Sequence, residues 1–334
     1  MQLPRPRGPL SAGLIEYLSG GWPPRPADAV PVESVLADDD GQLALWVLYE
    51  LHYRGFDGVP DDVEWDPVVL AARRRLEVAH EAALRAEAEA VDVCAPSGVP
   101  AALDRIVRSG EGPPLSSYLQ RRATVEQFRE FVAHRSVYHL KEADPHAWGI
   151  PRLAGAAKAA LVEIEYDEYG SGRVERMHAE LFGGLMRAFG LDDSYGRYVD
   201  EVPGCTLAVS NTGSLFGLHR RLRGALAGHL AAFEMTSTQP NRAYSRGVQR
   251  LGFGHDAARF FDEHVEADAV HEQVAAHDLC GTLARAEPET TADILFGARA
   301  ALAVERRFAE HLLTRWAQGS SSLYRAREVD QLTA

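Results

Sequence analysis

The chain has 334 residues, of which 46% are hydrophobic, and it carries a formal net charge of −13. This acidic balance, without any Lys/Arg-rich run, excludes the electrostatic footprint that binding to DNA, RNA or an anionic membrane requires. No apolar run of about 18 residues is present, and the first residues lack the apolar region of a signal peptide. We therefore expect a cytoplasmic protein with one or two globular domains.

The three cysteines, Cys94, Cys205 and Cys280, lie far apart and form no CxxC pair. Their odd number and spacing argue against both a disulfide framework and a thiolate zinc site. We expect them to be thiols without a chemical role.

Residues 1–120 are expected to form an N-terminal helical segment. Seven of the eighteen prolines lie before residue 34, which predicts no regular structure there. The acidic residues Asp38, Asp39 and Asp40 suit a helix N-terminus, and the following LALWVLYELHYRGF is apolar nearly all round. A second helix is expected from Pro67 through EVAHEAALRAEAEAV. The apolar surplus of LALWVLYEL predicts that this segment packs on the core and forms a two-fold dimer interface.

Residues 121–325 are expected to form the second, all-helical unit. Gly and Pro residues lie between the segments whose apolar residues recur at helical spacing, as in Gly149-Ile150-Pro151 and Gly170-Ser171-Gly172. Strand patterns are nearly absent. The expected helices span 124–142, 153–169, 174–189, 206–235, 255–283 and 291–318.

The stretch HVEADAVHE concentrates histidines and acids on one helix. At about 100° per residue, His264, Asp268 and His271 form one stripe. Such a stripe is commonly exposed to solvent, but Phe260 and Phe261 beside it indicate that part of it faces inward. A buried carboxylate with two imidazoles would cost several kcal/mol without a compensating cation.

Other expected helices carry groups that match this stripe. Glu234 lies in the apolar stretch LAGHLAAFEM, where an unpaired carboxylate is unfavourable. His178, in RMHAELF, could equally be a core histidine that is fully hydrogen-bonded. Glu142 and Glu168 could equally cap or decorate helix ends.

The phrases KEADPHAWGIPRLAGAAKAALVEIEYDEYGSGRVERMHAELF, GHLAAFEM and FDEHVEADAVHE resemble the haem-oxygenase-like diiron oxidases and oxygenases, often labelled iron-containing redox enzymes. The resemblance covers about residues 120–320, and LYELHYRGFDGVPDDVEWDP extends it. It implies an all-α, haem-oxygenase-like helical bundle with an N-terminal helical extension. It also implies that two Fe ions are the cofactors, with O2 as co-substrate. The ligands that it implies are Glu142, Glu168, His178, Glu234, His264, Asp268 and His271.

The chemistry of these residues agrees with iron. Four carboxylates and three imidazoles form an oxygen and nitrogen donor set that suits iron or manganese, and the four acids would balance two ferrous ions. The sequence lacks the Glu-x-x-His pattern of ferritin-like bundles. Glu168 and His178 are ten residues apart, about 15 Å along a straight helix, so we expect the helix to unwind at Gly170-Ser171-Gly172.

The resemblance leaves several functions open. The third histidine, His264, favours the branch that oxygenates nitrogen in small amines, guanidines or amino-heterocycles, in natural-product biosynthesis. The alternatives are a diiron oxidase that desaturates or cleaves a carbon chain, a helical interaction protein without turnover, and a haem or other cofactor. The expected partners are a small-molecule substrate, an external electron donor and a second copy of the chain.

Overall fold

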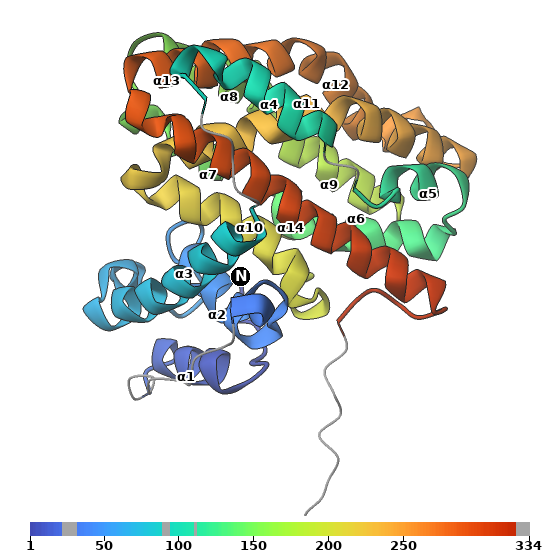
Figure 1. Cartoon of the computed structure of the whole chain (residues 1–334). Helices are drawn as coiled ribbons and strands as arrows, with labels where there is room; N and C mark the ends of the chain where they lie inside the picture. The colour runs from blue at the N-terminus through green and yellow to red at the C-terminus, as the bar shows by residue number, and fades with distance from the viewer. Residues whose placement is uncertain (22–31, 89–93, 110–111, 325–334) are drawn as a thin grey trace, which may run out of the picture.

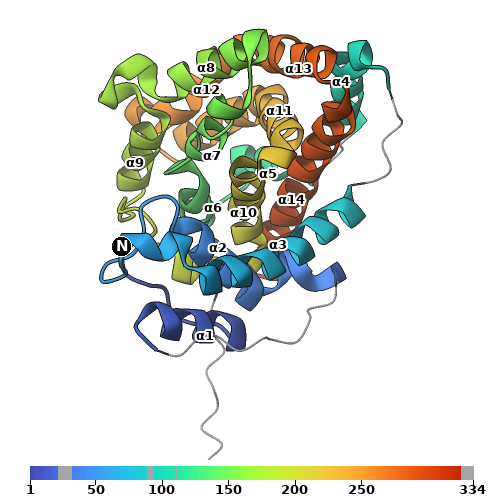
Figure 2. The ribbon, with the colours of Figure 1, turned by 90° about the vertical axis from the view of Figure 1, so that its left-hand side faces the viewer.

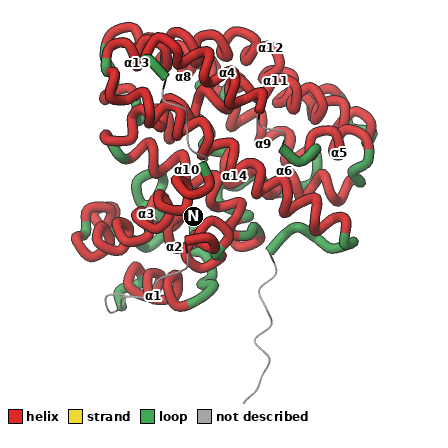
Figure 3. The backbone as a smooth tube through the Cα atoms, viewed as in Figure 1, coloured by secondary structure: helices red, strands yellow, loops and turns green. Residues whose placement is uncertain are grey.

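The computed structural model describes residues 1–21, 32–88, 94–109 and 112–324. This part of the chain consists of helices and loops without a β-strand, which confirms the all-α prediction (Figure 3). Within it, every helix is too short or too polar to cross a lipid bilayer. The α-helices in chain order are α1 (Pro9–Leu18), α2 (Asp39–Glu50), α3 (Pro67–Glu87), α4 (Val99–Ser109), α5 (Leu115–Arg121), α6 (Val125–His139), α7 (Asp144–Ala147), α8 (Gly155–Glu168), α9 (His178–Ala188), α10 (Gly204–Leu218), α11 (Arg223–Arg250), α12 (His255–Gln273), α13 (Thr282–Ala286) and α14 (Thr291–Ala317).

Helix α11 is the centre of the bundle, and its most extensive contacts are with α12 and α14 (Figure 1). Two glycines let α11 and α14 approach closely. A Cβ atom at Gly228 would overlap the carbonyl oxygen of Ile294, and one at Gly297 would overlap that of Ala225. These glycines therefore allow direct backbone contact between α11 and α14.

The N-terminal helices α1 to α3 form one end of the molecule (Figures 1 and 2). Helix α2 packs against α1, α3 and α10, and its residues Leu43 to Leu48 are at most 1% exposed. Leu45 and Tyr49 of α2 belong to the same hydrophobic cluster as Phe128 and Phe308, so the core continues across residue 120. The apolar surface that motivated the dimer expectation is thus covered within one chain. Dimerisation stays a prediction, and it would need another surface.

The expectation of irregular structure before residue 34 is wrong for α1. Pro9 occupies the first turn, where a missing N–H leaves no helical hydrogen bond unmade. The carboxylate of Asp40 accepts hydrogen bonds from the backbone N–H groups of Leu10 and Ser11, each at 2.8 Å. A side chain of α2 therefore caps the N-terminus of α1, and this contact stabilises a helix that the proline content did not predict. Residues 22–31, which hold four of the prolines, lie outside the described part of the chain.

The expected single helix over 206–235 is also wrong, because the chain breaks between α10 and α11. His219 has an extended backbone (φ −102°, ψ 110°), and its Nε2 lies 2.9 Å from Glu77 Oε1 of α3. Helix α11 then continues through Pro240 to Arg250. Gly217 and Gly224 flank the break, but Gly213 and Gly228 lie inside the two helices, so glycine placement alone does not locate the break.

Candidate metal centre

Five segments of the bundle bring six of the seven expected ligands together. Glu142 follows α6, Glu168 ends α8, His178 begins α9, Glu234 lies on α11, and His264 and His271 lie on α12. All are buried except Glu142, which is half-buried. The side chain of Asp268 lies outside the described part of the structure, although its backbone belongs to α12 between the two histidines.

The six side chains form two groups that share Glu168. The first group holds Glu142, Glu168, His178 and His264, and the second holds Glu168, Glu234 and His271. Within each group, one potential donor atom from every residue lies within 4.8 Å of the others. Two adjacent groups with one common carboxylate are the arrangement that a pair of neighbouring metal ions would need.

The chain turns sharply between Glu168 and His178, as the sequence predicts. Helix α8 ends at Glu168, and Gly170, Ser171 and Gly172 all have positive φ angles of 67°, 54° and 78°. Glycine adopts this conformation without steric penalty. A Cβ atom at Gly170 would also lie 2.6 Å from the backbone of Arg176, so this position requires glycine. The turn brings His178 Nδ1 to 2.8 Å from Glu168 Oε2.

Contacts outside the first group orient its members. His264 Nδ1–H donates to the carbonyl oxygen of Phe260 at 2.8 Å, which turns Nε2 toward Glu142 Oε2 at 3.6 Å. His139 Nδ1 donates to the other carboxylate oxygen of Glu142 at 2.9 Å. Burial alone would raise the pKa of Glu142, but the imidazoles of His139 and His264 hold it well below its usual value. Glu142 is therefore ionised and fixed in direction.

The second group has a similar support. His271 Nδ1 faces Glu234 Oε2 at 3.4 Å, while its Nε2–H donates to Asp167 Oδ2 at 3.1 Å. Burial alone would lower the pKa of His271, but its contacts with Glu234 and Asp167 raise it to about 9. A metal ion at Nδ1 would have to displace a proton. A π-helical segment, Val274–Gly281, follows directly, and such segments are frequent at functional sites.

The residues present fit an iron centre. The buried donor atoms face one another: His178 Nδ1 lies 2.8 Å from Glu168 Oε2, His264 Nε2 lies 3.6 Å from Glu142 Oε2, and His271 Nδ1 lies 3.4 Å from Glu234 Oε2. Since the donor atoms of each group also lie within 4.8 Å of one another, a metal ion placed among them could contact every residue of that group. Carboxylate and imidazole donors without thiolate suit iron or manganese more than structural zinc.

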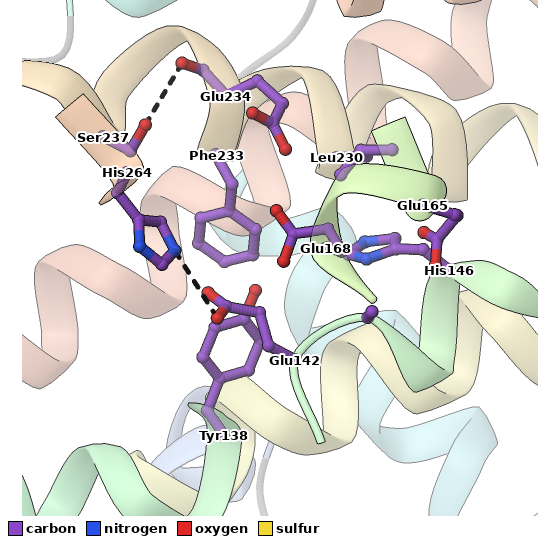
Figure 4. A pocket seen from close by; sticks show the side chains of 11 residues that line it. Tyr138, Glu142, His146, Glu165, Glu168, Leu230, Phe233, Glu234, Ser237 and His264 are labelled. Atoms are coloured by element: carbon purple, nitrogen blue, oxygen red, sulfur yellow. Dashed lines mark hydrogen bonds and ion pairs between the residues drawn. The ribbon is translucent and has the colours of Figure 1, made fainter. Parts of the chain in front are cut away.

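A small cavity of about 40 Å³ adjoins the two groups. Figure 4 shows the carboxylates of Glu142, Glu168 and Glu234 pointing into one space, with His264 at its side. The volume suffices for a few waters or ions, so a substrate would need adjoining space. The lining residues are Tyr138, Glu142, Ala143, His146, Glu165, Glu168, Leu230, Phe233, Glu234, Ser237 and His264.

Sequence reasoning missed four residues of this region: His139, His146, Glu165 and Asp167. Glu165 and Asp167 stand close to Glu168 in VEIEYDE, and Glu165 shares a helix face with it at a spacing of three. That spacing was the available signal. His139, the last residue of α6, lies three residues before Glu142. His146 is buried, and burial lowers its pKa to about 4, so it lines the cavity as a neutral imidazole.

A buried set of carboxylate and imidazole donors inside a helical bundle defines the class, a helical protein with a candidate metal centre. The model of the iron-containing redox enzyme family matches residues 129–306, more than half of the chain. The chain therefore belongs to the iron-containing redox enzyme family, as the resemblance implied. All six described donors lie within the matched residues.

Among solved structures, the chain is similar to the crystal structure of a CADD-like protein of unknown function from Nostoc punctiforme PCC 73102. The TM-score is 0.51 at 17% sequence identity, over 66% of this chain and 98% of that chain. This likeness concerns the fold alone. No curated protein matched the sequence.

Proposed function

We propose that the protein is a non-haem diiron oxygenase that transfers an oxygen atom from O2 to a nitrogen of a small amine, guanidine or amino-heterocycle. The observation that carries the proposal is the pair of donor groups with Glu168 in common. Glu142, Glu168, His178 and His264 would hold one iron, and Glu168, Glu234 and His271 the other. Asp268, between His264 and His271 on α12, is proposed as a further ligand.

Bound iron would supply the redox chemistry that activates O2, which no protein side chain provides. In the overall reaction, one oxygen atom enters the substrate and the other leaves as water, so two electrons and two protons are needed. We propose that an external electron donor supplies the electrons. The chain itself holds the donor atoms in place through His139, Asp167 and the Phe260 carbonyl, and the buried site limits access of water.

The lining of the cavity supports a nitrogen substrate over an acyl chain. Four of the lining side chains are glutamates. Glu142, Glu168 and Glu234 are proposed iron ligands whose charge the metal would balance, so Glu165 is the acid that remains for a substrate. A long apolar tunnel would suit a fatty acid, whereas an acid-lined pocket attracts a cationic amine or guanidine.

The test is anaerobic loading with Fe(II), followed by exposure to 18O2 with panels of amines, guanidines and fatty acids. Mass spectrometry should show one labelled oxygen on nitrogen in a member of the first two panels. Iron-loaded Glu163→Gln, a substitution at an exposed position of α8, should react like the wild type. Oxidation confined to the fatty acids, or iron-loaded protein that never consumes O2, would overturn the proposal.

A further inference from the structure

Glu165 is a buried acid whose two carboxyl oxygens both lack a hydrogen-bond partner. The residue is 2% exposed. Other buried acids are compensated: Glu50, for example, accepts hydrogen bonds from Lys141 and Tyr195, each at 2.9 Å. Leaving a buried carboxylate without a partner is strongly unfavourable, so Glu165 is a position where a partner is missing.

The position of Glu165 separates it from the metal ligands. It lines the cavity, but it belongs to neither donor group. It precedes Glu168 by three residues on α8, a rise of about 4.5 Å along the helix axis. The proposed ligands include four acids, which balance two ferrous ions. Glu165 is a fifth acid beside the centre, and in its ionised form it would need a cation other than the two irons.

The neighbours of Glu165 select the kind of partner. Burial, and then the nearby carboxylates of Glu168, Glu234 and Asp144, raise the pKa of Glu165 well above its usual value. With iron bound, the charges of Glu168 and Glu234 are balanced, but an ionised Glu165 would itself repel an anionic group, such as the head of a fatty acid. A cation that donates hydrogen bonds would satisfy both free oxygens and the local charge.

We propose that Glu165 is a substrate-binding residue whose carboxylate binds the cationic nitrogen group of the substrate, a guanidinium or a primary ammonium. This inference rests on the proposed function and deepens it by naming the charge of the substrate. Binding at Glu165 places the cationic group about one helical turn from Glu168, which both donor groups share. The substrate is therefore a small cation that reacts at or near its charged end.

The test compares the wild type with Glu165→Gln, which removes the charge and preserves the shape. Glu163→Gln is the matched control, because it removes an exposed charge from the same helix. Each protein is loaded anaerobically with Fe(II), and its iron content is measured. Methylguanidinium and its neutral counterpart methylurea are then titrated by calorimetry at matched ionic strength. The wild type and Glu163→Gln should prefer methylguanidinium, and Glu165→Gln should bind it at least tenfold more weakly with unchanged iron content.

Two results would overturn the inference. One is equal affinity of the wild type for methylguanidinium and methylurea, a comparison that does not depend on how any variant folds. The other is loss of iron from folded Glu165→Gln, which would make Glu165 a ligand. The titrations are repeated on metal-free protein. A wild type that fails to bind iron contradicts the proposed function, and the cation preference of the metal-free protein then decides the role of Glu165.

Discussion

The Nε2 atom of His271 lies 3.1 Å from Asp167 Oδ2, and this contact joins α12 to the end of α8. Asp167 is adjacent to Glu168, so one short segment supplies both the shared carboxylate and the group that orients a histidine. The hydrogen bond holds Nε2–H against Asp167, so the Nδ1 side of the ring faces Glu234. Carboxylates in this position fix the ring of a metal-binding histidine and increase its basicity.

Removing this carboxylate should weaken iron binding. For Asp167→Ala we expect the affinity of the iron position that contains Glu234 and His271 to fall about 10- to 100-fold, because the ring of His271 loses its orientation. Competition with an Fe(II) chelator measures the change. Asp262→Ala, at an exposed position of α12, should leave the affinity unchanged. Equal affinities for the two variants would show that Asp167 is merely a surface acid.

A buried ion pair should stabilise the junction between the N-terminal helices and the metal-binding bundle. Lys141 Nζ lies 2.9 Å from Glu50 Oε2, and both side chains are almost fully buried. Lys141→Met leaves Glu50 charged and uncompensated, so the free energy of unfolding should fall by about 3–5 kcal/mol. Urea denaturation measures this. Lys158→Met, the same change at a half-buried position of α8, serves as the control.

The double variant Glu50→Gln, Lys141→Met separates the pair from general packing. Because it removes both charges together, it should lose less stability than Lys141→Met alone. If the two variants lost the same amount, the ion pair would not be the source of the effect. Since Lys141 precedes Glu142, Lys141→Met is also expected to lower iron affinity.

His80 should make the protein sensitive to acid. Its Nδ1 accepts a hydrogen bond from Gln42 and its Nε2 faces Thr212 Oγ1, a pattern that suits only the neutral ring. Burial lowers its pKa to about 4 despite nearby Glu77 and Glu81, whereas the unfolded value is 6.5. Below pH 6.5 the unfolded chain binds a proton that the folded chain does not. Stability should therefore be full above pH 6.5 and should fall by up to about 1.4 kcal/mol per pH unit down to about pH 4.

The measurement is urea denaturation of the wild type and His80→Gln at pH 7 and pH 5. The loss of stability between these pH values should be smaller in the variant, which cannot take up the proton. Other buried histidines titrate in both proteins and cancel in the comparison. An equal loss in the two proteins would contradict this role of His80.

Much of the centre could be predicted because its signals are local in sequence. His264 and His271 share a helix stripe, and glycines mark the turn before His178. Each of these patterns can be recognised in the sequence without knowing how the helices pack. The all-α fold and the family followed from the same segments.

The rest depends on contacts between distant segments. Asp40 caps α1, and the contact of His219 with Glu77 lies at the break between α10 and α11; neither pairing has a sequence period. The importance of Asp167 likewise comes from the placement of α12 beside α8. In the sequence it is one more acid among several. Such residues are recognised only when the helices are in place.

The central claim is that Glu168 is common to two iron positions, and an anaerobic Fe(II) titration tests it most directly. The wild type and Glu163→Gln should bind about two irons per chain. Glu168→Ala should lose iron from both positions while circular dichroism shows an intact helical fold. A folded Glu168→Ala that binds as much iron as the wild type, or a wild type that binds none, would contradict the claim.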